Sequence, residues 1–140
     1  LQQVRLRNDR AGLSLDLKIS GPLSIFASGS QIELRNLVQG DDPRLAPLDQ
    51  FDRDETLLRA GLRYRFPGGL AIGFGTERSE VEFVAAGTDP ADDRSNEGTS
   101  PFIEVLQQGG NSLLRVEVVK RSLEPSPGSR FLPYDATFLV

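Results

Sequence analysis

A strict alternation of apolar and polar residues between Leu58 and Phe66 is the feature that most constrains the fold. The even-numbered positions of this stretch are apolar, and the odd-numbered positions are arginine or glycine. Side chains of a β-strand point alternately to opposite faces, so this period of two predicts a strand with one apolar and one polar face. Because a slip of one residue would exchange the two faces, the register of this strand is strongly specified.

Strand-like composition recurs along the whole sequence. Period-two character or β-rich composition is found at 4–7, 13–19, 31–37, 57–66, 70–85, 102–107, 113–121 and 131–140. No window sustains the apolar spacing of a helix, since glycine and proline interrupt nearly every segment, and the best helical candidate is 49–60 with Asp54 as its N-cap. The sequence therefore predicts an all-β fold of about eight strands in one domain over 1–140.

The connections between the predicted strands alternate in length from residue 31 onward. Short turns at 66–69 and 109–112 separate long polar segments at 38–54, 86–100 and 122–130. In an up-and-down antiparallel meander, this order places the long loops at one end and the short turns at the other. The first thirty residues depart from the order, because the turn-like stretches 8–12, 20–22 and 28–30 are all short. We expect the meander to close into a small barrel, with a β-sandwich as the alternative.

The composition excludes several kinds of chemistry. Histidine and cysteine are absent from the 140 residues, which removes Ser-His-Asp and Cys-His catalysis and the usual transition-metal ligands. The formal net charge of -4, without a clustered basic face, argues against a nucleic-acid partner. Glu80 and Glu82 fall on one face of a predicted strand, so a carboxylate-based hydrolase is a minor alternative to a salt-bridged or solvated role. We expect a protein without catalytic activity.

The predicted meander has short turns at one end, long acidic loops at the other, and an apolar face opposite a face of Arg, Glu and Gly. This pattern resembles a bacterial outer-membrane β-barrel of the porin-like kind, or a segment of one. The residues that carry the resemblance are 58–74, then 101–121 and 131–140. Nine residues from Leu58 to Phe66, at about 3.3 Å each and tilted by about 40°, rise roughly 23 Å, close to the roughly 25 Å apolar band of such barrels.

The resemblance implies that the apolar side chains face lipid and that the polar ones face the lumen, where arginines and glutamates pair across strands. The polar-face network expected on this basis comprises Arg59, Arg63, Arg65, Glu80, Glu82, Glu104, Arg115 and Glu117. The resemblance further implies a location in the outer membrane of a Gram-negative bacterium and a structural, pore-like or interaction role. Its partners would be lipid or other protein chains of the envelope.

The alternation of apolar and polar residues does not by itself show whether the apolar face meets lipid or a protein core. The same apolar face could pack inward in a soluble, secreted β-sandwich that acts as a binding or assembly module in the periplasm or outside the cell. Methionine is absent, including at position 1, and we expect a processed, exported chain. Either alternative allows homo-oligomers that form through exposed sheet edges.

The long segments 38–55 and 86–100 are rich in aspartate and glutamate. If both lie at the same end of the sheet, their carboxylates could supply the hard oxygen ligands that Ca²⁺ prefers. The candidate ligands are Asp89, Asp92, Asp93 and Glu97. No EF-hand spacing is present, so a hydrated, solubilising loop is the alternative, and we expect no other cofactor.

Overall fold

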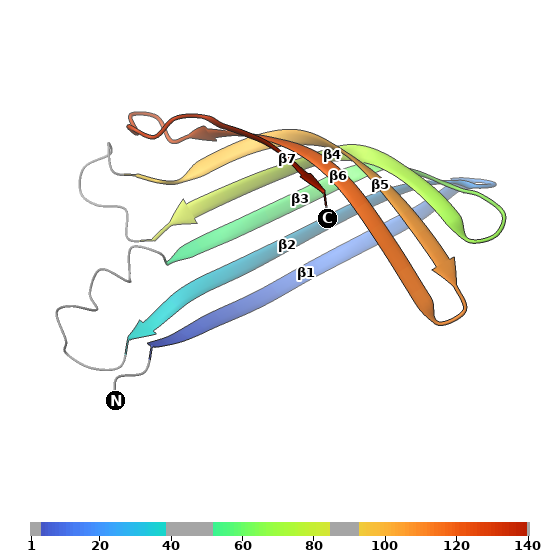
Figure 1. Cartoon of the computed structure of the whole chain (residues 1–140), viewed down its shortest axis with the longest axis horizontal. Helices are drawn as coiled ribbons and strands as arrows, with labels where there is room; N and C mark the ends of the chain where they lie inside the picture. The colour runs from blue at the N-terminus through green and yellow to red at the C-terminus, as the bar shows by residue number, and fades with distance from the viewer. Residues whose placement is uncertain (1–3, 39–51, 85–92, 140) are drawn as a thin grey trace.

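The structure is a computed structural model that describes residues 4–38, 52–84 and 93–139. These residues form seven antiparallel strands in a single sheet, each paired with its neighbours in the sequence (Figure 1). The strands are β1 (Val4–Ser20), β2 (Leu23–Val38), β3 (Arg53–Arg65), β4 (Leu70–Phe83), β5 (Asn96–Gly109), β6 (Ser112–Pro125) and β7 (Tyr134–Leu139). The predicted all-β, up-and-down antiparallel meander is confirmed.

Seven strands take the place of the eight or so expected, because two predicted interruptions are not turns. β1 continues through 8–12 and β2 continues through 28–30, and the two strands stay paired across both stretches, with Gly12 opposite Ser30. The segments 4–7 and 13–19 are therefore parts of one strand. The helix suggested for 49–60 is wrong in its described part, since β3 begins at Arg53 and pairs with β2 and β4.

The short turns β1–β2, β3–β4 and β5–β6 all lie at one end of the sheet (Figure 1). Glycines in the left-handed region of φ allow the chain to reverse there, with φ of 90° at Gly68 and 86° at Gly69. The Phe66 N–H donates to the Leu70 carbonyl oxygen at 2.7 Å and closes the β3–β4 turn. Because β1 and β2 are unbroken, the first thirty residues also follow the meander order, with the longer connections joining strands at the opposite end.

The sheet does not close into a barrel within the described residues. β1 pairs only with β2 and β7 only with β6, so both are edge strands. The β-sandwich alternative requires two packed sheets, whereas the described strands all belong to one. The described strands thus form a single curled sheet with two open edges.

The curl brings distant strands together on one face, which we call the concave face (Figure 1). Phe26 on β2 and Phe102 on β5 contact each other across two intervening strands, with ring centroids 5.9 Å apart. Gly61 and Gly75 lie between them in the same transverse row of the sheet. A Cβ atom at Gly61 would lie 2.8 Å from Cζ of Phe26, so the glycine makes room for the ring.

Candidate functional site

The opposite, convex face carries a continuous row of apolar side chains that crosses all seven strands. The row consists of Leu17, Ile25, Leu62, Phe74, Ile103, Val118 and Leu139. Phe74 and Ile103, in its middle, are each 58% exposed, although phenylalanine and isoleucine are normally among the most buried residues. Neighbouring apolar positions extend the row on the same face, and together they form what we call the convex band: the row plus Leu13, Leu15, Leu58, Tyr64, Ile72, Val105, Leu114 and Val116.

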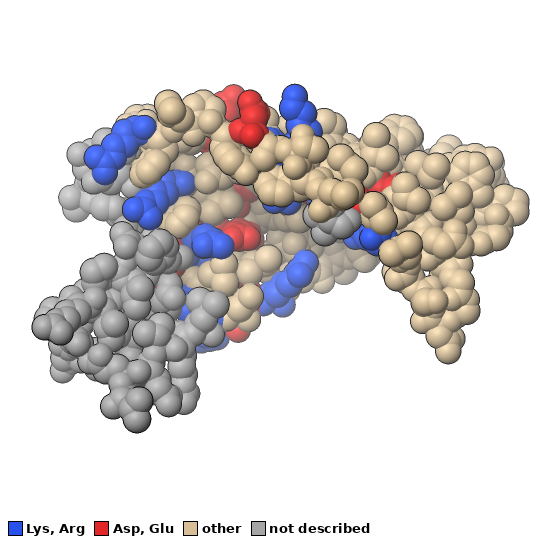
Figure 2. Space-filling model, viewed as in Figure 1, with Lys and Arg blue, Asp and Glu red and all other residues tan. Residues whose placement is uncertain are grey.

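The border of the convex band on the loop side shifts from strand to strand. On β3 the band reaches Leu58, whereas the residue paired with Leu58 on β4 is Arg78, and the last apolar residue there is Phe74. This step from the level of Leu58 to that of Leu62 is four residues, whereas a strand tilt of about 35–45° displaces a level border by only about one residue per strand, so tilt alone does not explain it. Figure 2 looks toward the concave side of the sheet, where charged side chains lie over the middle and the loop side, and the turn side is mostly uncharged in that view.

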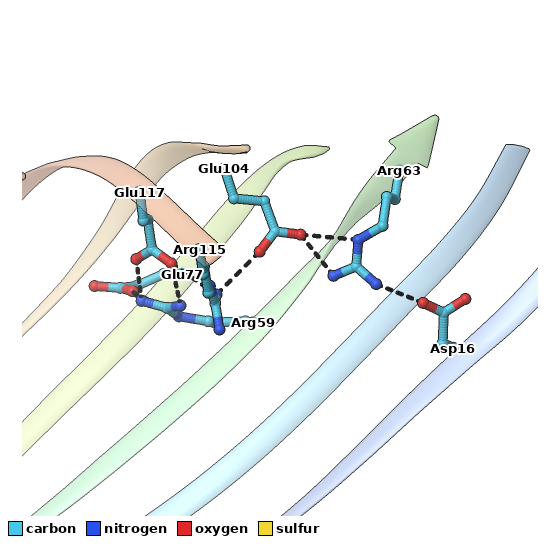
Figure 3. Close-up of polar contacts among 7 residues, drawn as sticks. All are labelled: Asp16, Arg59, Arg63, Glu77, Glu104, Arg115 and Glu117. Atoms are coloured by element: carbon cyan, nitrogen blue, oxygen red, sulfur yellow. Dashed lines mark hydrogen bonds and ion pairs between the residues drawn. The ribbon is translucent and has the colours of Figure 1, made fainter. Parts of the chain in front are cut away.

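The concave face carries a continuous ion-pair network, seven members of which are drawn in Figure 3. Arginines and carboxylates alternate along it in the order Arg121, Glu77, Arg59, Glu117, Arg115, Glu104, Arg63, Asp16 and Arg65. Every carboxylate therefore lies between two guanidinium groups. The network joins β1, β3, β4, β5 and β6, together with Arg65 at the end of β3.

Arg59 is the centre of the network. Its Nη1 and Nη2 atoms donate to Oε2 and Oε1 of Glu117 at 2.8 and 2.6 Å, the two-pronged geometry that suits a planar guanidinium. Its Nε atom donates to Glu77 Oε2 at 2.8 Å, and Nη2 contacts the same oxygen. Arg121 Nε donates to the second oxygen of Glu77 at 2.6 Å. Both carboxylates beside Arg59 are thus engaged through both oxygens.

Glu104 connects the centre of the network to β1. Its Oε1 atom accepts hydrogen bonds from Nε and Nη2 of Arg63 at 3.0 and 2.6 Å, and its Oε2 atom lies 3.0 Å from Nη2 of Arg115. Arg63 donates from its remaining nitrogen to Asp16 on β1. One arginine on β3 therefore links carboxylates that lie on β5 and β1 (Figure 3).

Three arginines of the network lie over phenylalanine rings of the same face. The pairs are Arg59 over Phe102 at 5.1 Å, Arg63 over Phe26 at 4.5 Å and Arg121 over Phe138 at 5.3 Å. Phe26, Phe102 and Val119 are buried and form the apolar cluster of the described residues, with Phe138 packed against it. This aromatic layer excludes water beneath the ion pairs and adds cation–π attraction to them.

Two carboxylates of the network are completely buried, since the exposed fraction of Glu77 and of Glu104 is 0%. Removing a carboxylate from water costs several kcal/mol, and close guanidinium partners offset that cost. Gly73, opposite Glu104 in the register, provides the space: a Cβ there would lie 2.7 Å from Oε1 and 2.8 Å from Cγ of Glu104. The small residues that alternate along β4 therefore accommodate side chains from neighbouring strands.

The structure brings together most of the residues predicted for the polar-face network, namely Arg59, Arg63, Glu104, Arg115 and Glu117. Arg65 joins them through Asp16, with its Nη2 atom 2.9 Å from Oδ2. Glu80 and Glu82 lie on the convex face instead. β4 has no register break, so these two glutamates share the face of Phe74 beyond the border of the convex band.

Three network members lie outside the set predicted from the sequence: Asp16, Glu77 and Arg121. Glu77 follows Gly73 and Gly75 at a spacing of two, and an unbroken alternation along β4 would have assigned it to the concave face. This assignment of Glu77 is hard to recognise in the sequence because the convex face changes from apolar to polar in this region. Apolar residues then alternate in the opposite phase, as at Val81 and Phe83.

The predicted Ca²⁺ ligands Asp89 and Asp92 lie outside the described residues. Asp93 Oδ1 accepts a hydrogen bond from the Ser95 N–H at 2.8 Å, and hydrogen bonds from Ser95 lower the pKa of Asp93 below its ordinary value. Glu97 pairs with Arg78 at 2.7 Å. In 4–38, 52–84 and 93–139, no three acidic residues lie close enough together to hold a metal ion, and the Ca²⁺ site stays a prediction.

No protein-family model, curated protein or solved structure matches the sequence. The part of the chain that the structure describes contains no helix that is long and apolar enough to cross a membrane. A function must therefore be argued from the chemistry of the two faces of the sheet.

Proposed function

We propose that this sheet is part of the wall of a β-barrel in the outer membrane of a Gram-negative bacterium. The convex band contacts lipid, and the ion-pair network faces an aqueous lumen. The observation that carries the proposal is the row of seven apolar side chains across the convex face, directly behind a face lined with ion pairs.

Water is an unfavourable surrounding for the convex band. Removal of one leucine, isoleucine or phenylalanine side chain from water is favourable by about 1.5–3 kcal/mol, and the band repeats such side chains on neighbouring strands. Contiguous apolar patches of this kind mark contact with a membrane or with another protein. The described residues form a single layer and provide no second layer to cover the band (Figure 1).

The concave face fits a lumen. Lumen-facing positions of membrane barrels are polar and alternate with lipid-facing positions along every strand. Here Leu62 and Arg63 on β3, and Ile103 and Glu104 on β5, are neighbours in the sequence that point to opposite faces. The same alternation therefore separates lipid contact from ion pairing on strands that lie far apart in the sequence.

The role that we propose is structural or pore-like, without catalysis. Both oxygens of Glu77 and of Glu117 already accept hydrogen bonds from arginines, so neither group is free to take a proton from a substrate. The sequence also contains no histidine or cysteine to act as a base or nucleophile. These carboxylates instead hold the curvature of the wall.

The proposal requires that the backbone groups at both edges of the sheet be hydrogen-bonded to further strands. In hydrocarbon, an unpaired backbone N–H or C=O group costs several kcal/mol, so a strand edge cannot be left open to lipid. β1 and β7 must therefore pair with additional strands, supplied by the same protein or by another copy. The wall described here would then be one sector of a larger closed sheet.

Extraction of the full-length protein tests the proposal. We expect it to remain in the membrane fraction after a carbonate wash, to require detergent for extraction, and to migrate differently on a denaturing gel before and after boiling. A folded, monodisperse protein in buffer without detergent would contradict the proposal and would favour the soluble binding or assembly module.

A further inference from the structure

The concave face contains a hollow of about 510 Å³ beside the ion-pair network, over β1 and β2. Its floor is built from small residues that face each other in pairs, Gly12 opposite Ser30 and Ser14 opposite Ser28. Elsewhere on the concave face, arginine, glutamate and phenylalanine side chains fill the corresponding positions. The hollow exists because the sequence of β1 and β2 leaves this area without large side chains.

The residues that line the hollow carry a net positive charge. Four arginines line it, namely Arg10, Arg59, Arg63 and Arg115, whereas Asp16 is the one acidic residue among its lining residues. Asp16 is already shared between Arg63 and Arg65. Ion pairs with the carboxylates of the network neutralise most of the charge of Arg59, Arg63 and Arg115, whereas Arg10 has no acidic partner among the described residues.

Two of the lining arginines have donors to spare. Arg115 contacts Glu104 and Glu117 through Nη2, and with the described residues its Nε and Nη1 atoms make no hydrogen bond. Its side chain is 46% exposed. Arg10 is exposed and makes no hydrogen bond or ion pair with the residues that the structure describes. Both guanidinium groups can therefore turn a free N–H edge toward a ligand.

We propose that this hollow binds a small, water-soluble oxyanion that carries at least two negative charges, such as inorganic phosphate or a dicarboxylate. The planar fork of a guanidinium group matches phosphate and carboxylate oxygens two at a time. The hollow falls within the range of about 300–1,000 Å³ that is usual for small-ligand sites. It lies on the face opposite the convex band, so its ligand arrives from water, and the site does not depend on what covers the convex face.

Titration of the full-length protein in detergent micelles with inorganic phosphate at near-neutral pH tests this proposal. We expect saturable binding to one site, followed by calorimetry and by the NMR signals of arginine Nε–H groups, and competition by succinate but not by chloride at equal ionic strength. The substitutions Arg10→Gln and Arg115→Gln should each weaken binding by about tenfold or more. Arg10 has no partner among the described residues, so its loss should leave the fold intact.

Arg7→Gln is the matched control. It removes the same charge from the same strand, but Arg7 lies on the opposite face, where it pairs with Asp9. Binding should change by less than about twofold in this variant. The proposal is overturned if phosphate shows no saturable binding below about 10 mM, or if all three substitutions weaken binding equally, because the effect would then reflect net charge alone.

Discussion

Arg59 on β3 and Glu117 on β6 form a two-pronged ion pair, with N–O distances of 2.8 and 2.6 Å, although two strands lie between them. In a flat sheet, strands three places apart are separated by about 14 Å, so curvature brings these side chains within reach. The pair in turn stabilises the curvature. The curvature of the sheet and the ion pairs on its concave face therefore depend on each other.

Loss of Arg59 should destabilise the sheet strongly. Arg59→Gln leaves the fully buried Glu77 with one guanidinium partner instead of two and removes both prongs from Glu117. Removal of one partner of a buried ion pair typically costs about 3–5 kcal/mol, and we expect about 3 kcal/mol because Arg121 and Arg115 remain. Urea unfolding in detergent micelles, followed by circular dichroism, measures the change.

Arg78→Gln provides the comparison, because it removes an arginine that pairs with Glu97 at the surface, where both side chains are more than half exposed. An exposed pair contributes less than about 1 kcal/mol. Equal losses of stability in the two variants would show that burial of the network does not matter.

Replacement of Gly73 by alanine should displace Glu104, one of the buried carboxylates of the ion-pair network. The new Cβ would lie 2.7 Å from Oε1 of Glu104, and the carboxylate would have to move away from Arg63. Overpacking of this kind costs about 1–3 kcal/mol. Gly109→Ala is the matched control, since a Cβ there meets nothing within 4 Å. The unfolding free energies of the two variants in micelles should differ accordingly, and matching values would contradict the close approach of Glu104.

A lysine in the middle of the convex band should be costly in a bilayer. Ile103→Lys places a charge in the apolar row, and at the middle of a bilayer this costs about 2–4 kcal/mol in a membrane barrel. Thr99→Lys changes the same strand and face beyond the border of the band, where the cost falls to about 0–1 kcal/mol. Folding efficiency into liposomes compares the two variants. Equal folding of both would show that the band does not meet hydrocarbon.

Asp93 makes the loop end of the sheet sensitive to acid. Hydrogen bonds from Ser95 lower its pKa in the folded protein, so the charged form contributes stability above the unfolded-state pKa, and that contribution is lost as the pH falls through the lower folded-state pKa. A carboxyl ¹³C NMR titration should give a midpoint below that of an ordinary aspartate. Ser95→Ala should move the midpoint upward, whereas an ordinary midpoint in the unsubstituted protein would rule out these hydrogen bonds.

The central strands could be predicted from the sequence because their alternation is strict and their turns contain Pro67 and paired glycines. The first two strands could not, since 8–12 and 28–30 have the composition of turns. On the concave face, however, small and polar residues are compatible with a strand, and at Gly12 and Ser30 they form the floor of the hollow. Composition alone does not distinguish a turn from a strand with a small-residue lining.

The sequence predicted that arginines and glutamates form an ion-pair network on one face, but it identified only some of the residues that belong to it. Parity assigns Arg59, Arg63 and Glu104 to the face opposite the apolar residues, but it does not reveal which arginine meets which glutamate. Those pairings depend on the curl of the sheet, which glycines and phenylalanines in one row across four strands accommodate. The change from apolar to polar at the border of the band reversed the apparent phase on β4 and misplaced Glu80 and Glu82.

Fluorescence quenching by brominated lipids tests contact between the convex band and lipid most directly. The sequence contains no tryptophan, so a single introduced tryptophan is the sole reporter. Val105 and Leu106 are adjacent on β5 and point to opposite faces. In liposomes, we predict that lipids brominated along their acyl chains quench Val105→Trp strongly and Leu106→Trp weakly, whereas quenching of Val105→Trp by aqueous iodide with no effect of the brominated lipid would contradict the account.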